Sequence, residues 1–156
     1  MQPESAAPTT SLPHHLFTAI DHVGIAVWDL ETAIRFYSET FGLEVAHQEV
    51  NEDQGVREAM LPVGESGSCI QLMAPLTPDS VIAKFLDRRG QGIQQLAYRV
   101  TDLEAVSEEL RLRGVRLLYD EPRHGTGGSL VNFVHPRHAG GVLVELVQPN
   151  QEPEPS

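Results

Sequence analysis

Two side chains that can bind a metal occupy matching positions in two similar halves of the sequence. Residues 20–33 match residues 93–106 almost position by position, which pairs His22 with Gln95 at a separation of 73 residues. An internal repeat of this kind predicts that the fold itself is duplicated. The imidazole and the amide therefore occupy equivalent positions in two copies of one structural unit.

The end of each half supplies a second pair of donor side chains. Residues 70–73 match residues 144–147, which pairs Gln71 with Glu145 at a separation of 74 residues. A glutamate inside an apolar strand is costly to bury unless it is protonated, ion-paired or bound to a metal. The histidine and the glutamines also have a structural alternative, as hydrogen-bonded residues within strands. Because all four residues fall at repeat-related positions, we interpret them together as a divalent metal site.

The donor types restrict the choice of metal. An amide oxygen is a harder and less basic donor than an imidazole nitrogen, so the site favours divalent ions that prefer oxygen, such as Mn2+, Ni2+ or Mg2+. A structural zinc site would use cysteine and histidine in a closed tetrahedron. A non-haem iron oxygenase would use two histidines and one carboxylate. The donor set contains one histidine, His22, which counts against a dioxygenase.

Glu58 is the candidate for proton-transfer chemistry. In the predicted strand 55–62 it shares a face with apolar side chains, and desolvation there would raise its pKa. The alternative is a surface glutamate paired with Arg57. A separation of 74 residues matches Glu58 with Asn132, which cannot ionise. We therefore predict that the two halves differ where a base is needed.

The strand that carries the histidine predicts an open space on one face. Alternation over residues 19–27 places His22, Gly24 and Ala26 on the same side. Two small residues beside the imidazole are typical of the floor of a cavity. We expect substrate or metal to approach the histidine from that side.

Each half has the same order of predicted elements, which is a strand, a helix and three strands. The helices begin after the N-cap residues Asp29 and Asp102 and close at Gly42 and Gly114. The predicted strands cover residues 19–27, 43–50, 55–62, 68–74, 93–100, 116–119, 129–134 and 141–147. The fold class is therefore α+β, with two tandem βαβββ modules that form a curved, partly open sheet with a central metal site.

We predict a single domain over residues 17–149, made of repeats at about 17–75 and 91–149 and joined by a connector helix at 79–89. The first 16 residues are rich in Pro, Ser, Thr and Ala, and we predict that they form a disordered N-terminal arm. Residues 150–156 are predicted to form a disordered tail. A chain of 156 residues is long enough to bury a substantial core.

Composition excludes several classes of protein. The 22 acidic and 11 basic residues give a net charge of -11, which does not fit a nucleic-acid-binding surface. No apolar run approaches the roughly 20 residues of a membrane helix, and residues 1–13 lack the pattern of a signal peptide. The single cysteine, Cys69, cannot form an internal disulfide and is predicted to be an inert packing residue. We therefore expect a cytoplasmic protein without nucleic-acid or membrane partners.

Several stretches are similar to one known superfamily. They are residues 21–27, 71–75, 117–122, 132–136 and 141–146. The double βαβββ repeat, with histidine in its first strand and glutamate in its last, resembles the vicinal oxygen chelate superfamily, which includes glyoxalase I and the extradiol dioxygenases. More closely, these stretches look like the methylmalonyl-CoA epimerase family. The resemblance covers nearly all of residues 17–149.

The resemblance implies roles for five residues. It places the metal ligands at His22, Gln71, Gln95 and Glu145 and suggests Co2+ as the metal. It places the catalytic base at Glu58, which would remove the α-proton of a small-molecule acyl-CoA substrate to give an enolate. Glu145 is the candidate for the second catalytic acid. A metal-bound carboxylate is a poor proton donor, so a water or another residue remains an alternative for that role.

One departure from the family and two alternative functions remain. Many family members have two histidines where this chain has Gln94 and Gln95, so we expect a lower affinity for metal. Superfamily members often dimerise, and a homodimer is expected by that resemblance alone. The same fold could also serve a glyoxalase I-like isomerase, or a non-catalytic protein that binds a small molecule and lacks the metal.

Overall fold

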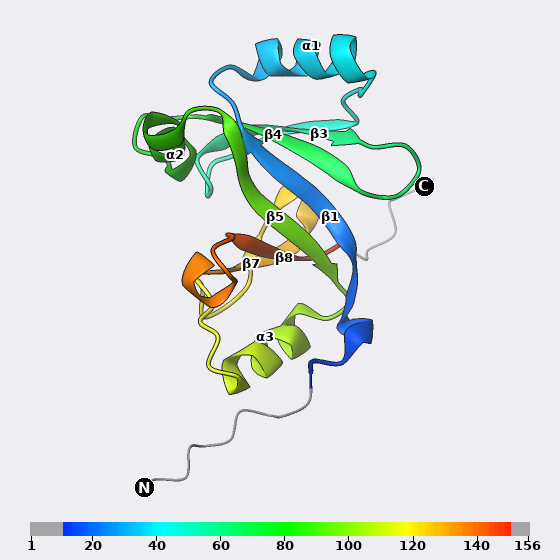
Figure 1. Cartoon of the computed structure of the whole chain (residues 1–156), viewed down its shortest axis with the longest axis vertical. Helices are drawn as coiled ribbons and strands as arrows, with labels where there is room; N and C mark the ends of the chain where they lie inside the picture. The colour runs from blue at the N-terminus through cyan, green and yellow to red at the C-terminus, as the bar shows by residue number, and fades with distance from the viewer. Residues whose placement is uncertain (1–10, 151–156) are drawn as a thin grey trace, which may run out of the picture. The chain divides into compact units, whose positions relative to one another are not determined.

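The computed structural model describes residues 11–150 and contains the predicted order of elements (Figure 1). The elements are η1 (His14–Leu16), β1 (Phe17–Ala26), α1 (Leu30–Phe41), β2 (His47–Asn51), β3 (Val56–Pro62), β4 (Cys69–Pro75), α2 (Val81–Arg89), β5 (Gly92–Val100), α3 (Leu103–Leu112), β6 (Arg123–His124), η2 (Thr126–Gly128), β7 (Leu130–Val134), η3 (Pro136–His138) and β8 (Val144–Gln148). Each half therefore follows the order βαβββ, and the α+β fold class is confirmed.

The chain divides into two compact units, which we describe separately. The first unit is Ile20–Ala97, and the second is Met1–Ala19 together with Tyr98–Ser156. The predicted disorder of residues 1–10 and 151–156 lies outside the described residues. Within the predicted arm, η1 is ordered and its Leu16 is buried in a hydrophobic cluster, so ordered structure begins before residue 17.

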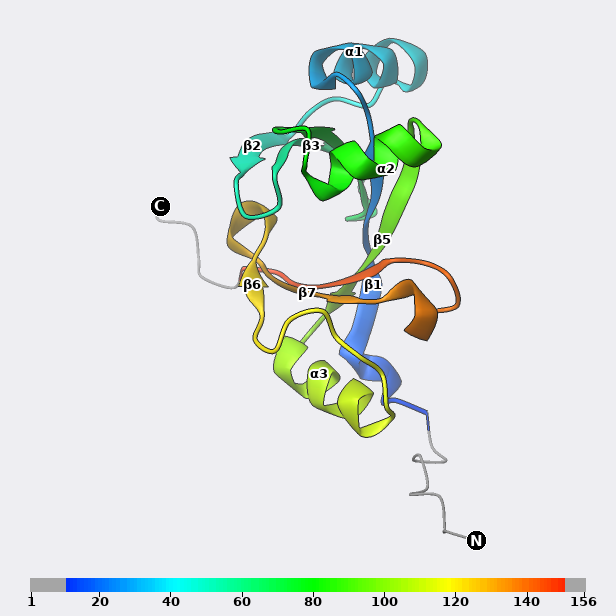
Figure 2. The same ribbon diagram turned by 90° about the vertical axis from the view of Figure 1, so that its left-hand side faces the viewer.

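In the first unit the strands follow the order β2-β3-β4-β1-β5, and Figure 2 shows β2 and β3 side by side at one end of this order. β1 runs parallel to β4, and the β2–β3 and β3–β4 pairs are antiparallel. Helix α1 packs on one face over a cluster that includes Leu72 and Ala59. Helix α2 covers residues of the opposite face, where Ala26 and Met73 pack against Leu86. The open floor predicted at Ala26 is therefore absent, because α2 fills that space.

Helices α1 and α3 begin as their sequences predict. The Asp29 carboxylate accepts hydrogen bonds from the backbone N–H and the hydroxyl of Thr32, and these bonds hold the pKa of Asp29 below its usual value of 3.8. At the start of α3, the Asp102 carboxylate accepts the backbone N–H of Ala105. Gly42 ends α1 in the left-handed backbone conformation, with a φ of 70°, and this conformation favours glycine. Within residues 11–150, no helix is both long enough and apolar enough to cross a membrane.

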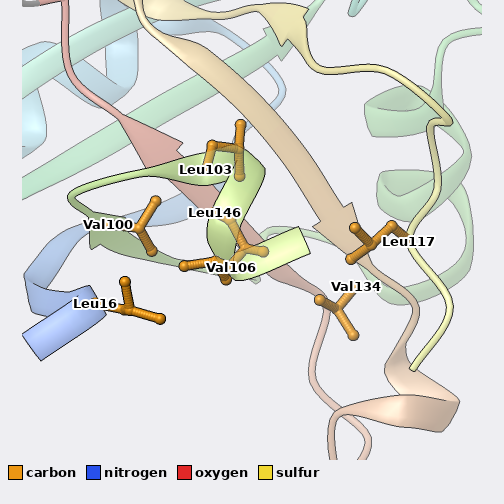
Figure 3. Packing of buried hydrophobic residues seen from close by; sticks show 7 residues of the cluster. All are labelled: Leu16, Val100, Leu103, Val106, Leu117, Val134 and Leu146. Carbon is orange, nitrogen blue, oxygen red and sulfur yellow. The ribbon is translucent and has the colours of Figure 1, made fainter. Parts of the chain in front are cut away.

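In the second unit the strand order is β8-β7-β6, and both ladders are antiparallel. Helix α3 packs on one face through Leu103 and Val106, which join Leu146 of β8 and Val134 of β7 in a buried cluster (Figure 3). Leu16 belongs to the same cluster, which explains why η1 is ordered.

The strand predicted at 116–119 does not form. A single bridge joins Leu117 to Val134, and the regular strand in this part of the unit is the short β6. The side chain of Asn132 replaces the missing ladder, because its Oδ1 accepts the backbone N–H of Tyr119 and its Nδ2 donates to the carbonyl of Tyr119. An amide side chain thus satisfies backbone groups that a neighbouring strand would otherwise bind.

Candidate metal and proton-transfer site

Three of the four predicted metal ligands meet inside the first unit. His22 lies on β1, Gln71 on β4 and Gln95 on β5, which are neighbouring strands, and all three side chains are buried. The Nε2 of Gln95 lies 3.4 Å from His22 Nε2 and 3.4 Å from Gln71 Oε1. The structure therefore brings these residues together as predicted, with two acceptor atoms directed at one amide group.

The second nitrogen of the histidine fixes the role of the first. His22 Nδ1 lies 2.7 Å from a carboxylate oxygen of Asp21 and is the donor in that hydrogen bond. This arrangement leaves a lone pair on Nε2, which faces Gln95. A carboxylate behind a histidine orients the ring and increases its basicity as a metal ligand. Sequence reasoning did not identify Asp21. This residue directly precedes His22, and neighbouring residues of a strand are expected to point to opposite faces.

The donor atoms fit a divalent cation. His22 Nε2 and Gln71 Oε1 are acceptors that converge, and rotation of the Gln95 amide exchanges its nitrogen for its oxygen at the same place. Within residues 11–150 there is no group of three or more His, Cys, Asp or Glu side chains that could hold a metal. The predicted ligand set is not of this kind, because two of its four members are glutamines, and it remains a prediction.

A glycine makes room for Gln95 above β1. A Cβ atom placed on Gly24 would lie 2.5 Å from Gln95 Cγ and 2.8 Å from the terminal methyl of Met73. Contacts this short force a neighbour to move. The predicted open space beside His22 is therefore not found at Gly24, because the side chains of Gln95 and Met73 occupy it.

Glu58 is buried beside the ligand set. It lies on β3 directly opposite Met73 of β4 and is 2% exposed, which rules out the alternative of a surface glutamate. The Nε2 of Gln71 donates a hydrogen bond to Glu58 Oε2 at 2.8 Å. The amide of Gln71 therefore contacts both residues, since its nitrogen donates to the Glu58 carboxylate and its oxygen faces Gln95.

Strand pairing corrects the predicted match between Glu58 and Asn132. The residue opposite Gln71 lies two positions after Glu58 on β3, and the residue opposite Glu145 lies two positions after Val131 on β7. When Gln71 is aligned with Glu145, Glu58 therefore aligns with Val131. The prediction of Asn132 was wrong by one residue, and a one-residue shift places a side chain on the opposite face.

The fourth predicted ligand lies in the second unit. Glu145 is on β8 opposite Phe133 and is 7% exposed, so its carboxylate is nearly as buried as that of Glu58. Its participation in the same metal site as His22, Gln71 and Gln95 remains a prediction. The role of Cys69 as an inert packing residue also remains a prediction; the cysteine is a half-buried free thiol at the start of β4.

A sequence model of the Glyoxalase/Bleomycin resistance protein/Dioxygenase superfamily matches residues 21–133, and the chain belongs to that superfamily. Its relatives define the family more narrowly. The crystal structure of methylmalonyl-CoA epimerase from Mycobacterium tuberculosis is 57% identical, with a TM-score of 0.86 and coverage of 90% of this chain and 93% of that one. A variant of the Streptomyces coelicolor methylmalonyl-CoA epimerase in complex with 2-nitronate-propionyl-CoA is 46% identical, with a TM-score of 0.82 and coverage of 85% and 98%.

A curated relative supports the same family. The mitochondrial methylmalonyl-CoA epimerase of Homo sapiens is 35% identical over 130 residues, which span 83% of this chain and 73% of the human protein. Within the superfamily, the chain therefore belongs to the methylmalonyl-CoA epimerases. The family resemblance expected from the sequence is confirmed.

Proposed function

We propose that this chain is a methylmalonyl-CoA epimerase, which interconverts (2R)- and (2S)-methylmalonyl-CoA. The observation that carries the proposal is the buried Glu58 carboxylate, held by Gln71 beside the donors of His22 and Gln95. A base fixed next to a group that stabilises negative charge is the requirement for removing a proton α to a carbonyl. Epimerase relatives at 35% to 57% identity support the same substrate.

The reaction follows from the chemistry of the substrate. Its α-carbon lies between a thioester and a carboxylate, so the electron pair of the C–H bond can move into the thioester carbonyl. Glu58 takes the proton at one carboxylate oxygen, while Gln71 holds the other oxygen through Nε2. Return of a proton to the opposite face of the planar carbon gives the other epimer. Burial of Glu58 excludes bulk water from this step.

Superfamily membership and the epimerase relatives suggest a divalent metal ion. We propose that His22 Nε2, Gln71 Oε1, the Gln95 amide oxygen and the Glu145 carboxylate hold it. Co2+ is the metal suggested by the family, and the amide donors also suit Mn2+, Ni2+ or Mg2+. When bound, the ion supplies Lewis-acid stabilisation of the negative charge that develops on the thioester oxygen.

Glu145 has two proposed roles that one experiment separates. As a metal ligand it would be a poor proton donor, whereas as the second acid it would return the proton to the face away from Glu58. A Glu145→Gln variant keeps an oxygen donor but cannot transfer a proton. If Glu145 is the second acid, this variant exchanges the α-proton of one epimer with heavy water without forming the other epimer. If it forms the other epimer at the normal rate, a water or another residue is the acid.

The test of the proposed function is epimerisation of (2R)-methylmalonyl-CoA, followed by chiral analysis of the product. We expect turnover that a chelator abolishes and that added Co2+ restores. The alternatives of a glyoxalase-like isomerase and of a non-catalytic binder predict no epimerisation in either condition. Isomerisation of a glutathione hemithioacetal would identify the first alternative, and tight ligand binding after removal of the metal would identify the second. The expected homodimer is a separate proposal, which light scattering of the purified protein tests.

A further inference from the structure

The proposed base has a second carboxylate directly beside it on the neighbouring strand. In the antiparallel β2–β3 pair, Glu49 is the residue opposite Glu58. Side chains of such a pair point to the same face of the sheet, and their Cβ atoms lie about 5 Å apart. Like charges at directly opposite positions destabilise a sheet. Departures of this kind from the rules of stability are expected at functional sites.

A histidine holds this second carboxylate in place. His47 lies on the same face of β2 as Glu49, and its Nε2 lies 2.6 Å from Glu49 Oε1. Because an ionised carboxylate can only accept hydrogen bonds, the imidazole is the donor. The contact offsets part of the negative charge that Glu49 brings to this pair of strands, and it orients the carboxylate beside Glu58.

Exposure to solvent increases along these three side chains. Glu58 is 2% exposed, whereas the side chains of Glu49 and His47 are 29% and 47% exposed. Glu49 therefore lies between a buried carboxylate and the surface, within a single pair of strands.

The other neighbours of Glu58 in the β2–β3–β4 ladder cannot take up its proton. Three of them are apolar residues, which are Val56, Met60 and Met73. The fourth is Gln71, whose amide nitrogen donates to Glu58 Oε2 at 2.8 Å and has no lone pair that accepts a proton. Of the residues that pair with Glu58 or flank it on this face, Glu49 is the one that can accept a proton.

Proton removal by a buried base requires such a route. Each turnover in which Glu58 removes the α-proton leaves it as a neutral acid, and the next turnover in that direction needs the carboxylate again. Burial of Glu58 restricts direct exchange of this proton with bulk water. A neighbouring acceptor that reaches solvent removes the restriction.

We propose that Glu49, held by His47, is a proton relay that returns Glu58 to its ionised state after it has removed the α-proton. The proposal rests on the function proposed above, because it needs Glu58 as the base. The O–H bond of protonated Glu58 breaks, and the proton passes to the Glu49 carboxylate, directly or through one bridging water. Glu58 regains its negative charge, and Glu49 becomes neutral and then releases the proton to solvent. Glu49 acts through Glu58 and does not need to touch the substrate.

Comparison of single and multiple turnovers of a Glu49→Gln variant tests the relay. Glutamine keeps an oxygen that can accept from His47, but it cannot carry the proton. With enzyme in excess over the epimer whose α-proton faces Glu58, the rate of the first turnover should equal that of the wild type. With substrate in excess, kcat should fall about tenfold or more, because loss of the proton from Glu58 becomes rate-limiting. Equal losses in the two regimes, or no loss in either, overturn the relay.

Stability and two further variants separate the relay from a structural role. Glu49→Gln should unfold at or above the wild-type temperature, because the like-charge pair is removed. A lower unfolding temperature, with first and later turnovers slowed together, would identify a structural role instead. Glu52→Gln removes the same charge from the turn between β2 and β3 and should leave kcat unchanged. His47→Gln should lower kcat by a smaller factor than Glu49→Gln, and a normal kcat would remove the histidine from the relay.

The same measurements distinguish failure of the relay from failure of the proposed function. A wild-type chain that epimerises the substrate, with an unchanged kcat in Glu49→Gln, rejects the relay and retains the epimerase. A wild-type chain that neither epimerises the substrate nor exchanges its α-proton rejects both.

Discussion

The β3–β4 pair of the first unit and the β7–β8 pair of the second unit share one ladder but place their charges differently. At equivalent positions the first has Glu58 and Gln71, and the second has Val131 and Glu145. The carboxylate is on the outer strand of one pair and on the inner strand of the other. A carboxylate at position 71 would face Glu58 as a second negative charge, whereas an amide can donate to Glu58 and still offer an oxygen. In the proposed mechanism, Glu58 serves proton transfer and Glu145 serves the predicted metal site, so the two halves of the duplicated scaffold use their acids differently.

The opposite face of the same strands differs as well. Ala59 of β3 packs under α1, and its equivalent on β7 is Asn132, which is completely buried and holds the backbone of Tyr119. In the first unit, β2 pairs with β3 over five residues, whereas β6 pairs with β7 over two. The asparagine therefore compensates for a shorter outer strand. Its role is structural, and Glu58, the proposed base, aligns with Val131 and so has no acidic counterpart in the second unit.

Substitution of Glu58, the proposed base, should have the largest effect on activity. Glu58→Gln should lower kcat by about 10²- to 10⁴-fold, the range for loss of a general base, with unchanged metal content. Steady-state epimerisation and metal analysis measure the two quantities. Glu52→Gln, at an exposed glutamate of the same unit, is the matched control and should keep full activity. Equal activity of the two variants would remove Glu58 from the mechanism.

A methyl group at Gly24 should have the next largest effect. Its equivalent on β5 is Ala97, where a Cβ is already accommodated, but at Gly24 a Cβ would lie 2.5 Å from Gln95 Cγ. Gly24→Ala should displace the Gln95 amide, weaken metal binding and lower kcat/KM by about 10²-fold, since small misplacements are costly. Gly92→Ala is the control, because a Cβ there meets no atom within 4 Å. Normal metal affinity in Gly24→Ala would show that Gln95 is not a ligand.

Removal of the structural amide should affect stability and spare the chemistry. Asn132→Ala removes the side-chain acceptor of the Tyr119 N–H and one of the donors to the Tyr119 carbonyl, which Arg111 also contacts, and should cost about 2 kcal/mol in the free energy of unfolding. Urea denaturation measures this loss, and kcat of the folded variant should stay normal. Asn51→Ala, which removes one hydrogen bond to the N–H of Gln54, should cost less. A large loss of kcat without a loss of stability would show that Asn132 contributes to catalysis and would contradict its structural role.

The smallest expected effect concerns Asp29, the N-cap residue of α1. Thr32 lowers the pKa of Asp29, so the ionised carboxylate is favoured in the folded chain. A lowered pKa contributes stability above pH 3.8, and this contribution is lost as the pH falls through the lower folded-state value. Thermal unfolding of the wild type and of Asp29→Asn should therefore differ at neutral pH and converge as the pH falls below the lowered folded-state pKa of Asp29. A difference that is independent of pH would mean that the charge of Asp29 does not contribute.

The sequence was sufficient for most of the fold and for the identity of the candidate site residues. The repeat predicted both βαβββ modules, and the repeat-related positions selected His22, Gln71 and Gln95. Glu58 was selected because an acid is costly on an apolar strand face. The residue of the second half that is equivalent to Glu58 was misassigned. Glu58 lies 13 positions before Gln71, whereas Val131 lies 14 positions before Glu145. The second half therefore has one additional residue in this segment, and a comparison of the two sequences does not show at which position it is inserted.

Features that depend on packing were beyond prediction. Residues 116–119 have the apolar character of a strand, but the Asn132 side chain satisfies the backbone that a strand would pair. Asp21 was overlooked because its contact with His22 runs between adjacent residues rather than along one face. One pocket is lined both by residues 116–118 and by residues of the turn at 135–138, and only the folded chain brings these two segments together.

The most direct test of the central claim is exchange of the α-proton of methylmalonyl-CoA in heavy water, observed by NMR with each separate epimer. The wild-type protein should exchange the proton of both epimers. The Glu58→Gln variant, with the same bound metal, should fail to exchange the proton of the epimer whose C–H faces position 58. Exchange of that proton at the wild-type rate would contradict the assignment of Glu58 as the base.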